Sequence, residues 1–266
     1  MLYLVATPIG NLKDMSFRAI ETLKQVDEIA CEDTRHSLSL LNHYEIKKPL
    51  FSYHKFNEQE ISEKIISKLE SGLNIAVISD AGTPCISDPG NILIKKVIER
   101  GLEFTVVPGA CAFVNALVLS GFDTNRFCFI GFLPEKNKDR IELLERYKNL
   151  DMSLIFYCAP HDVKKDIESI YGVFGDRRAC AVKEITKLYE SAEQFSLKDG
   201  LQKEPKGEYV LIVSGKEFVN DLLALSEKEH IDYYIKQGVD KKDAIKMVAK
   251  ERGVSKSSLY KYTIED

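Results

Sequence analysis

Short apolar runs alternate with helical patterns through the first part of the chain. The runs that predict strands lie at 2–6, 26–30, 75–79 and 104–107, with a shorter candidate at 50–53. Between them, apolar residues recur three or four positions apart, as in Phe17, Ile20 and Leu23, which predicts amphipathic helices. Strands that alternate with helices form a largely parallel sheet covered on both faces. The N-terminal part is therefore expected to be an α/β domain.

The pattern changes near residues 108–122, where Pro108-Gly109 precedes a small-residue helix from Ala110 to Leu119. We place a domain junction there. Further strands are expected at 127–131, 153–157, 179–183, 187–196 and 208–214, with helices at 138–149 and 161–173. The segment from Tyr189 to Phe195 is expected to run antiparallel to its neighbours. The predicted organisation is an α/β domain at 1–115, a smaller α/β domain at 116–216 and a helical tail at 217–266.

The tail has the layout of a helix-turn-helix, in which Gly253 makes the turn and Ser255 caps the second helix. The exposed positions of that helix are expected to be Lys256, Ser257, Tyr260 and Lys261. Residues 236–261 contain eight Lys or Arg against three Asp or Glu, a local charge of +5. These features favour contact with nucleic acid. Helix packing or dimerisation is the alternative role.

Composition narrows the class of protein. The chain has 266 residues, is 44% hydrophobic and carries a net charge of −4. No apolar run approaches the length of about 20 residues needed to cross a bilayer, so we expect a cytoplasmic protein without a membrane partner. The six cysteines are scattered singly, without zinc-ligand spacing, so they are expected to be buried thiols. No metal site is expected.

The most informative segment is the loop at 79–90, which follows one predicted strand and precedes a helix. It contains two glycines, two prolines, two aspartates, two serines and a threonine. Ordinary strand-to-helix connections are shorter, roughly 2–6 residues. In open α/β sheets, ligands bind beyond the carboxyl ends of the strands, where this loop must lie. The loop is thus a candidate ligand site, the alternative being a routine connection.

Several common activities lack their motifs. The turn after the first strand, Ala6 to Leu12, has no GxGxxG, and no strand is followed by GxxxxGK, which disfavours NAD and ATP. There is no GxSxG elbow, and the five histidines fall on surface-like positions, so hydrolase chemistry has no support. Polar clusters at 31–35, 52–58 and 183–187 each follow a strand and are expected to share one rim. Helix capping, solvated loops and an ordinary ion pair are their respective alternatives.

Seven segments together closely resemble the ribosomal RNA small subunit methyltransferase I family, over essentially the full length. They are Leu4 to Leu12, Glu32 to Arg35, Tyr53-His54 with Asn57-Glu58, Ser79 to Gly90, Pro108-Gly109, Gly131 to Pro134 and Glu184 to Lys187. That family belongs to the tetrapyrrole methylase superfamily, whose members bind S-adenosylmethionine in a cleft between two α/β domains and are typically dimers. The resemblance implies 2′-O-methylation of a cytidine ribose in the decoding region of 16S ribosomal RNA, within the small ribosomal subunit.

The resemblance also implies which residues line the cofactor pocket. They are Pro8, Ile9, Asp80, Ala81, Gly82, Thr83, Ile86, Cys111, Ala112, Tyr157, Cys158 and Ile185. Most are expected to act through the backbone. The chain departs from the family at Cys158, where glutamate is frequent, and at Asp162, where arginine is frequent.

For catalysis we expect Lys187 or Glu184, from the second domain, to face Asp88, Arg35 and His54 across the cleft. One of these groups would accept the proton of the ribose hydroxyl. Lys187 could do so only if burial or neighbouring cations lowered its pKa. Arg35 suits bidentate phosphate contact.

Two other functions compete with RNA methylation. A methylase of a corrin or porphyrin precursor would use the same cofactor pocket, but a flat apolar macrocycle suits the polar loops at 32–35 and 53–58 poorly. A helix-turn-helix regulator that senses a ligand through its α/β body would bind duplex DNA without turnover.

Overall fold

The computed structural model describes residues 1–217 and 221–263. The chain forms two compact units, Met1–Lys216 and Glu217–Asp266, which are described separately below. The predicted tail includes residues 218–220 and 264–266, which lie outside the described residues. In the part of the chain that the structure describes, no helix is long and apolar enough to cross a membrane.

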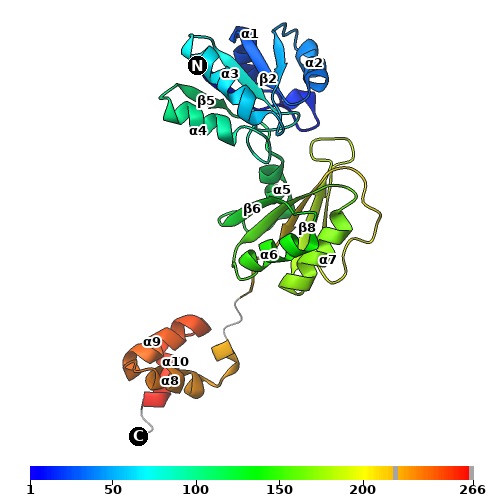
Figure 1. Cartoon of the computed structure of the whole chain (residues 1–266). Coiled ribbons are helices and arrows are strands. Elements are labelled where there is room, and N and C mark those ends of the chain that lie inside the picture. The colour runs from blue at the N-terminus through cyan, green and yellow to red at the C-terminus, as the bar shows by residue number, and fades with distance from the viewer. Residues whose placement is uncertain (218–220, 264–266) are drawn as a thin grey trace. The chain divides into compact units, whose positions relative to one another are not determined.

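The first sheet of the Met1–Lys216 unit is entirely parallel, in the order β3-β2-β4-β1-β5. Its strands are β1 (Leu2–Val5), β2 (Glu28–Cys31), β3 (Leu50–Ser52), β4 (Ile75–Ile78) and β5 (Phe104–Val107). Helices α1 (Phe17–Gln25), α2 (Thr34–His43), α3 (Glu58–Glu70) and α4 (Asn91–Glu99) connect them (Figure 1). Two buried clusters, one containing Leu23 and Leu41 and the other Ile65 and Leu93, fill the two faces. The predicted parallel α/β arrangement is confirmed.

The second sheet is mixed, in the order β6-β7-β10-β8-β9, and only the β6–β7 pair is parallel. Its strands are β6 (Phe127–Phe132), β7 (Ser153–Cys158), β8 (Arg178–Lys183), β9 (Ser191–Ser196) and β10 (Tyr209–Val213). Helix α5 (Ala112–Ser120) packs on one face, whereas α6 (Asn137–Tyr147) and α7 (Val163–Phe174) cover the other. The predicted division after residue 115 falls inside α5; that boundary stays a prediction.

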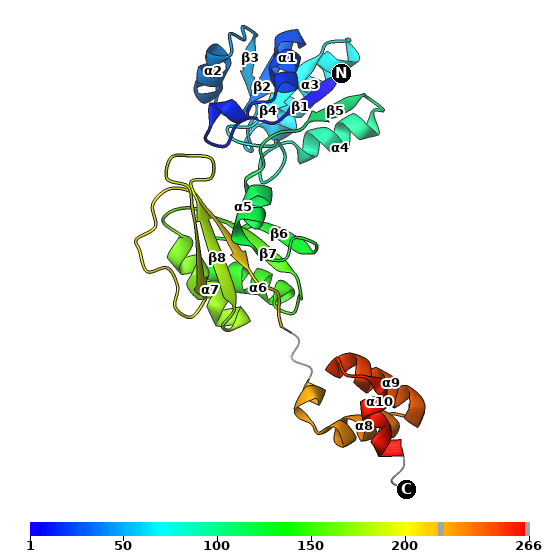
Figure 2. The same ribbon diagram turned by 180° about the vertical axis from the view of Figure 1, so that it is seen from behind.

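The last antiparallel strand begins later than expected. β9 begins at Ser191, so the predicted start at residue 187 is wrong. Residues 184–190 form a loop because Glu184 and Thr186 adopt left-handed backbone angles, with φ of 49° and 67°, which no strand can accommodate. Figures 1 and 2 show this connection from β8 to β9 projecting toward the first sheet.

The Glu217–Asp266 unit is helical, with its own small core. It contains η2 (Asp221–Ala224), α8 (Glu227–Lys236), α9 (Lys241–Arg252), α10 (Lys256–Leu259) and η3 (Tyr260–Thr263). Gly253 ends α9 in the left-handed conformation, with φ of 64°, and the Ser255 hydroxyl accepts the amide of Ser258. Ile231, Val248 and Leu259 fill the core.

One histidine in this unit contradicts the expectation that all five lie at the surface. His230 is 0% exposed. Its Nε2 lies 3.0 Å from Glu251, and its Nδ1 accepts a hydrogen bond of 3.2 Å from Arg252. The imidazole joins α8 to α9, which explains why a polar side chain is tolerated in so small a core.

Candidate functional site

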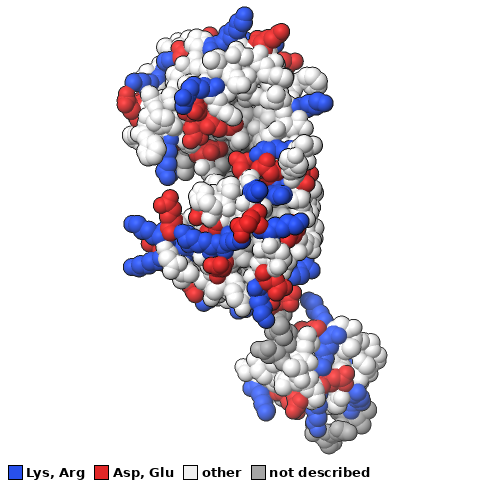
Figure 3. Space-filling model, turned by 90° about the vertical axis from the view of Figure 1, so that its right-hand side faces the viewer, with Lys and Arg blue, Asp and Glu red and all other residues white. Residues whose placement is uncertain are grey.

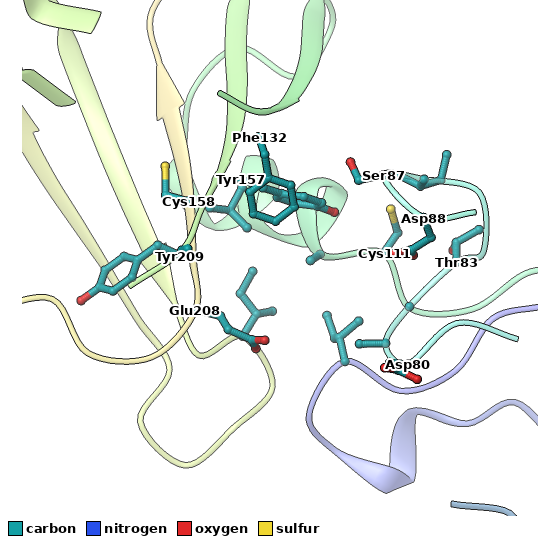
Figure 4. A pocket seen from close by; sticks show the side chains of 18 of the residues that line it. Asp80, Thr83, Ser87, Asp88, Cys111, Phe132, Tyr157, Cys158, Glu208 and Tyr209 are labelled. Carbon is teal, nitrogen blue, oxygen red and sulfur yellow. The ribbon is translucent and has the colours of Figure 1, made fainter. Parts of the chain in front are cut away.

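A cavity of about 360 Å³ opens at the carboxyl end of β4 in the Met1–Lys216 unit (Figure 4). Both α/β halves contribute to its lining: Ile9, Asp80, Ala81, Gly82, Thr83, Ile86, Ser87, Asp88, Cys111, Ala112, Phe132, Tyr157, Cys158, Ala159, Pro160, Ile185, Glu208, Tyr209 and Val210. The volume lies within the range of small-molecule sites, roughly 300–1,000 Å³. Its position follows the rule that open α/β sheets bind ligands beyond the strand ends.

The loop at 79–90 forms one wall largely through its backbone. Thr7 and Gly82 exchange two main-chain hydrogen bonds, of 2.9 and 3.1 Å, and the Thr83 hydroxyl donates to the Ala110 carbonyl at 3.0 Å. Gly82 has φ of 83°, and a Cβ there would lie 3.1 Å from Cγ2 of Ile9. A larger residue at position 82 would therefore fill space beside a cavity-lining side chain.

A second glycine lets the chain approach the turn after β1. A Cβ on Gly109 would lie 2.8 Å from the Cβ of Ala6. Only glycine allows this spacing, which brings the start of α5 to the cavity. Cys111 and Ala112 consequently reach its lining.

The end of β7 supplies the opposite wall. The Tyr157 ring packs against Phe129 and Phe132, with centroids 4.9 and 5.3 Å away. The Cys158 thiol lies in the hydrophobic cluster under α6 and α7. Burial raises the pKa of this thiol well above the usual range, with a further contribution from Asp166. Figure 4 shows the sulfur pointing away from the cavity. Cys158 thus borders the cavity through its main chain.

Three acidic side chains interact at this wall: Asp80 and Asp88 of the loop, and Glu32 after β2. Burial, followed by repulsion from the neighbouring Glu32 and Asp80 carboxylates, raises the pKa of Asp88 to about 6. Burial and Asp80 likewise raise the pKa of Glu32. The Asp33 amide donates to Asp80 at 3.2 Å, which holds that carboxylate in place. Asp88 is consequently a carboxyl group that changes charge just below neutral pH, on the wall of the cavity.

Lys187 is held between two carboxylates. Its Nζ lies 3.2 Å from Glu184 and 2.8 Å from Glu208. Burial tends to lower the pKa of Lys187, but the hydrogen bonds to Glu208 and Glu184 outweigh it and raise the pKa overall. The lysine side chain also packs on Gly10, where a Cβ would lie 2.5 Å from its Cγ. Lys187 therefore remains protonated, and the condition for its acting as a base is not met.

Glu184 is also committed to its neighbours. Its carboxylate accepts the Glu208 amide at 2.9 Å, and this hydrogen bond, followed by the contact with Lys187, lowers its pKa. A carboxylate so stabilised is a weak proton acceptor.

The predicted site residues are distributed unevenly. Eleven of the twelve predicted cofactor residues line the cavity, the exception being Pro8. Of the five predicted catalytic residues, only Asp88 is in the lining. The Arg35 side chain is 92% exposed and lies 3.7 Å from Asp33. His54 is half-buried beside Phe56, with ring centroids 6.0 Å apart. Their functional roles stay predictions.

The residues predicted to bind RNA are on the tail unit. Lys256, Ser257, Tyr260 and Lys261 are exposed, as the sequence pattern indicates. Lys261 is 3.0 Å from Glu227, so part of its charge is neutralised.

Seven lining residues were missed by sequence reasoning: Ser87, Phe132, Ala159, Pro160, Glu208, Tyr209 and Val210. Ser87 and Phe132 lie within segments that carry the resemblance, which is a signal that could have found them. Tyr209 and Val210 begin an ordinary apolar strand that Glu208 precedes, and no local pattern marks these three residues. Among the described residues, no group of three or more His, Cys, Asp or Glu could hold a metal ion.

Residues 1–199 match the protein-family model described as Tetrapyrrole (Corrin/Porphyrin) Methylases. Among curated proteins, the chain is 44% identical to "Ribosomal RNA small subunit methyltransferase I" of Halalkalibacterium halodurans, over 97% of this chain and 93% of that protein. It is 44% identical to the Haemophilus influenzae protein of the same name, over 98% of this chain and 95% of that protein. The Bacillus subtilis protein of that name is 42% identical, over 98% and 92%.

Solved structures share the fold at low sequence identity. A crystal structure of diphthine synthase matches 81% of this chain and 89% of its own, with a TM-score of 0.65 and 14% identity. A crystal structure of uroporphyrin-III-C-methyltransferase from Thermus thermophilus matches 80% of this chain and 93% of its own, with a TM-score of 0.55 and 17% identity.

Proposed function

The chain belongs to the tetrapyrrole (corrin/porphyrin) methylases and, within them, to the ribosomal RNA small subunit methyltransferase I family, and we propose that it methylates the ribose 2′-oxygen of a cytidine in the decoding region of 16S ribosomal RNA. It is a methyltransferase that uses S-adenosylmethionine. The observation that carries the proposal is the cavity between the two α/β halves, walled by the backbone of residues 80–83 and bordered by Asp88. The names of the relatives support ribosomal RNA as the substrate.

The residues of the cavity fit the cofactor. Gly82 leaves room that a Cβ would occupy, and Gly109 brings the start of α5 close enough to form a wall. Asp80 to Thr83, Cys111-Ala112 and Tyr157-Cys158 would hold it, mostly through main-chain groups suited to its adenine and methionine ends. When bound, S-adenosylmethionine supplies an activated methyl group on a sulfonium.

Asp88 is the residue best suited to accept the proton of the ribose hydroxyl. Its carboxyl has a pKa of about 6, so it is mainly ionised at neutral pH but still basic enough to take a proton. Lys187 is protonated and Glu184 is stabilised as the anion, which makes both weaker candidates. The remaining predicted residues, Arg35 and His54, would position phosphate or ribose at the rim.

One assay tests the proposed reaction. The protein is incubated with methyl-labelled S-adenosylmethionine and either unmethylated small ribosomal subunits or a porphyrinogen, and the product is digested and identified. We expect label on the ribose of a cytidine. Label on the macrocycle, or on a base, would contradict the proposal, as would labelling of neither substrate.

The helical tail is expected to strengthen RNA binding. In the full chain, Lys256→Gln with Tyr260→Ala should raise KM for the RNA about tenfold, because a phosphate contact and a stacking surface are lost. The affinity for S-adenosylmethionine should not change, since the tail has a core of its own. Steady-state kinetics and calorimetry measure the two quantities. A chain ending at Lys216 should behave similarly, and an unchanged KM in both would assign the tail a packing role.

We propose that the protein is a homodimer joined through the outer face of α5. That face exposes Val114, Val118 and Leu119, at 45%, 67% and 44%. Adjacent exposed apolar residues on a helix are typical of an interface with another protein surface. Val118→Glu should convert a dimer to a monomer in analytical ultracentrifugation. Ile98→Glu, at a 61% exposed position on α4, is the control and should remain dimeric. A wild-type monomer at micromolar concentration would contradict the proposal.

A further inference from the structure

A second cavity, of about 350 Å³, lies beside β8, β9 and β10 in the Met1–Lys216 unit. It is lined by Ala181, Lys183, Ser191, Glu193, Leu201, Lys203, Glu204, Lys206 and Tyr209. The segment between β9 and β10 supplies one side, and Figures 1 and 2 show it running along the edge of the sheet. We call this hollow the lysine groove. The reaction assigned to the first cavity does not use it.

The charge of the lysine groove is unusual for this protein. Three lysines meet there, although the chain as a whole has a net charge of −4. Within the residues that the structure describes, ion pairs are found for none of Lys183, Lys203 and Lys206. The Glu204 carboxylate, by contrast, is paired with Lys164 of α7, which neutralises it. Glu193 is the second carboxylate of the groove, and Lys183 also acts on Glu184 through its charge. The groove thus holds three lysines against one carboxylate not neutralised by Lys164, and this excess of positive charge favours an anion.

The lysine groove adjoins the cofactor cavity. Tyr209 lines both. In Figure 4 its ring points away from the cofactor cavity, so its main chain borders one hollow while its ring turns toward the other. The two hollows therefore meet at the first residue of β10. Figure 3 shows Lys and Arg side chains in a band across this part of the molecule.

The geometry points to a binding site for the phosphodiester backbone of the RNA strand that flanks the methylated nucleotide, and this inference rests on the proposed function. Lysines bind phosphates as point charges without reading sequence, which is the chemistry of register and orientation on a nucleic acid. A strand held there would present its neighbouring ribose to the adjoining cavity, where Asp88 is.

The test measures how RNA binding depends on salt. The full chain, saturated with S-adenosylmethionine, is compared with its Lys203→Gln/Lys206→Gln variant on an unmethylated RNA fragment. Each phosphate contact on single-stranded RNA contributes about 0.7 to the slope of log Kd against log salt concentration. Two lost contacts should reduce the slope by about 1.4 and raise KM about tenfold near physiological salt, with kcat unchanged. Lys203→Arg/Lys206→Arg should restore both. Lys138→Gln, on α6 and outside the groove, should leave the slope and KM unchanged.

The outcomes separate this inference from the proposed function. If the wild-type protein methylates no RNA, the proposed function fails. If it does, and the glutamine variant keeps the wild-type slope, the groove contacts no backbone and the inference is wrong even if KM has risen. Adding inorganic phosphate at constant ionic strength tests whether the groove is instead a site for a small anion. If submillimolar phosphate inhibits RNA methylation saturably, and this inhibition disappears in the glutamine variant, the inference is also overturned. Unchanged binding of S-adenosylmethionine shows that the variants are folded.

Discussion

Replacing Asp88 with asparagine should lower kcat for RNA methylation by about 10²–10⁴-fold, the usual contribution of a general base. Asparagine has nearly the same shape but cannot accept the proton of the ribose hydroxyl. The affinity for S-adenosylmethionine should change little, because the backbone of the loop at 79–90 forms most of that wall. Single-turnover kinetics and calorimetry measure the two quantities.

The pH dependence gives this prediction a second readout. Since Asp88 must be ionised to act, kcat of the wild-type protein should rise with pH through about 6 and then level off. Glu32 raises the pKa of Asp88, so Glu32→Gln should move this rise to lower pH while keeping the plateau. Asp88→Asn should abolish the rise of kcat with pH. An unchanged rise in the asparagine variant would assign the ionisation to another group.

The same shift predicts the sign of the stability change. A carboxyl whose pKa is higher in the folded than in the unfolded state favours folding only at low pH, and this contribution is lost as pH rises through about 6. At pH 7.5 the ionised Asp88 thus destabilises the folded state, and asparagine removes this destabilisation. Asp88→Asn should melt no lower than wild type at that pH, so a lower Tm together with lost activity would indicate misfolding rather than lost catalysis.

Gly82→Ala should weaken S-adenosylmethionine binding at least tenfold. The left-handed backbone at φ of 83° costs alanine about 1–2 kcal/mol. In addition, the new Cβ would lie 3.1 Å from Ile9, a residue of the cavity lining, and would displace it or the loop. Isothermal titration calorimetry measures the affinity, and thermal melting measures the stability.

Gly72 provides the matched control for this variant. Its φ is 90°, and nothing lies within 4 Å of where its Cβ would be. Gly72→Ala should therefore lose a similar amount of stability without changing the affinity for the cofactor. If both alanine variants bind S-adenosylmethionine as the wild type does, the backbone at Gly82 is not part of the cofactor site.

The hydrophobic pattern was sufficient to predict most of the strands and helices because each kind of element repeats with its own short period. Alternation predicted the parallel first sheet, and the long small-residue loop at 79–90 indicated a ligand wall before any tertiary information was used. The glycine turn and serine cap of the tail are likewise local signals, so the structure reproduces them at Gly253 and Ser255.

Tertiary structure decided what depends on neighbours distant in sequence. Lys187 stays protonated because Glu208, just before β10, and Glu184 both bind its ammonium group, and the pKa of Asp88 is raised by burial and by Glu32. Nothing near Tyr209 in the sequence marks it as the wall between two hollows. Sequence by itself determined the α/β character of the first sheet, the family and the loop that lines the cavity. Burial and charge pairing act across the fold, and they decided that Asp88 has a raised pKa and that three lysines gather in one groove.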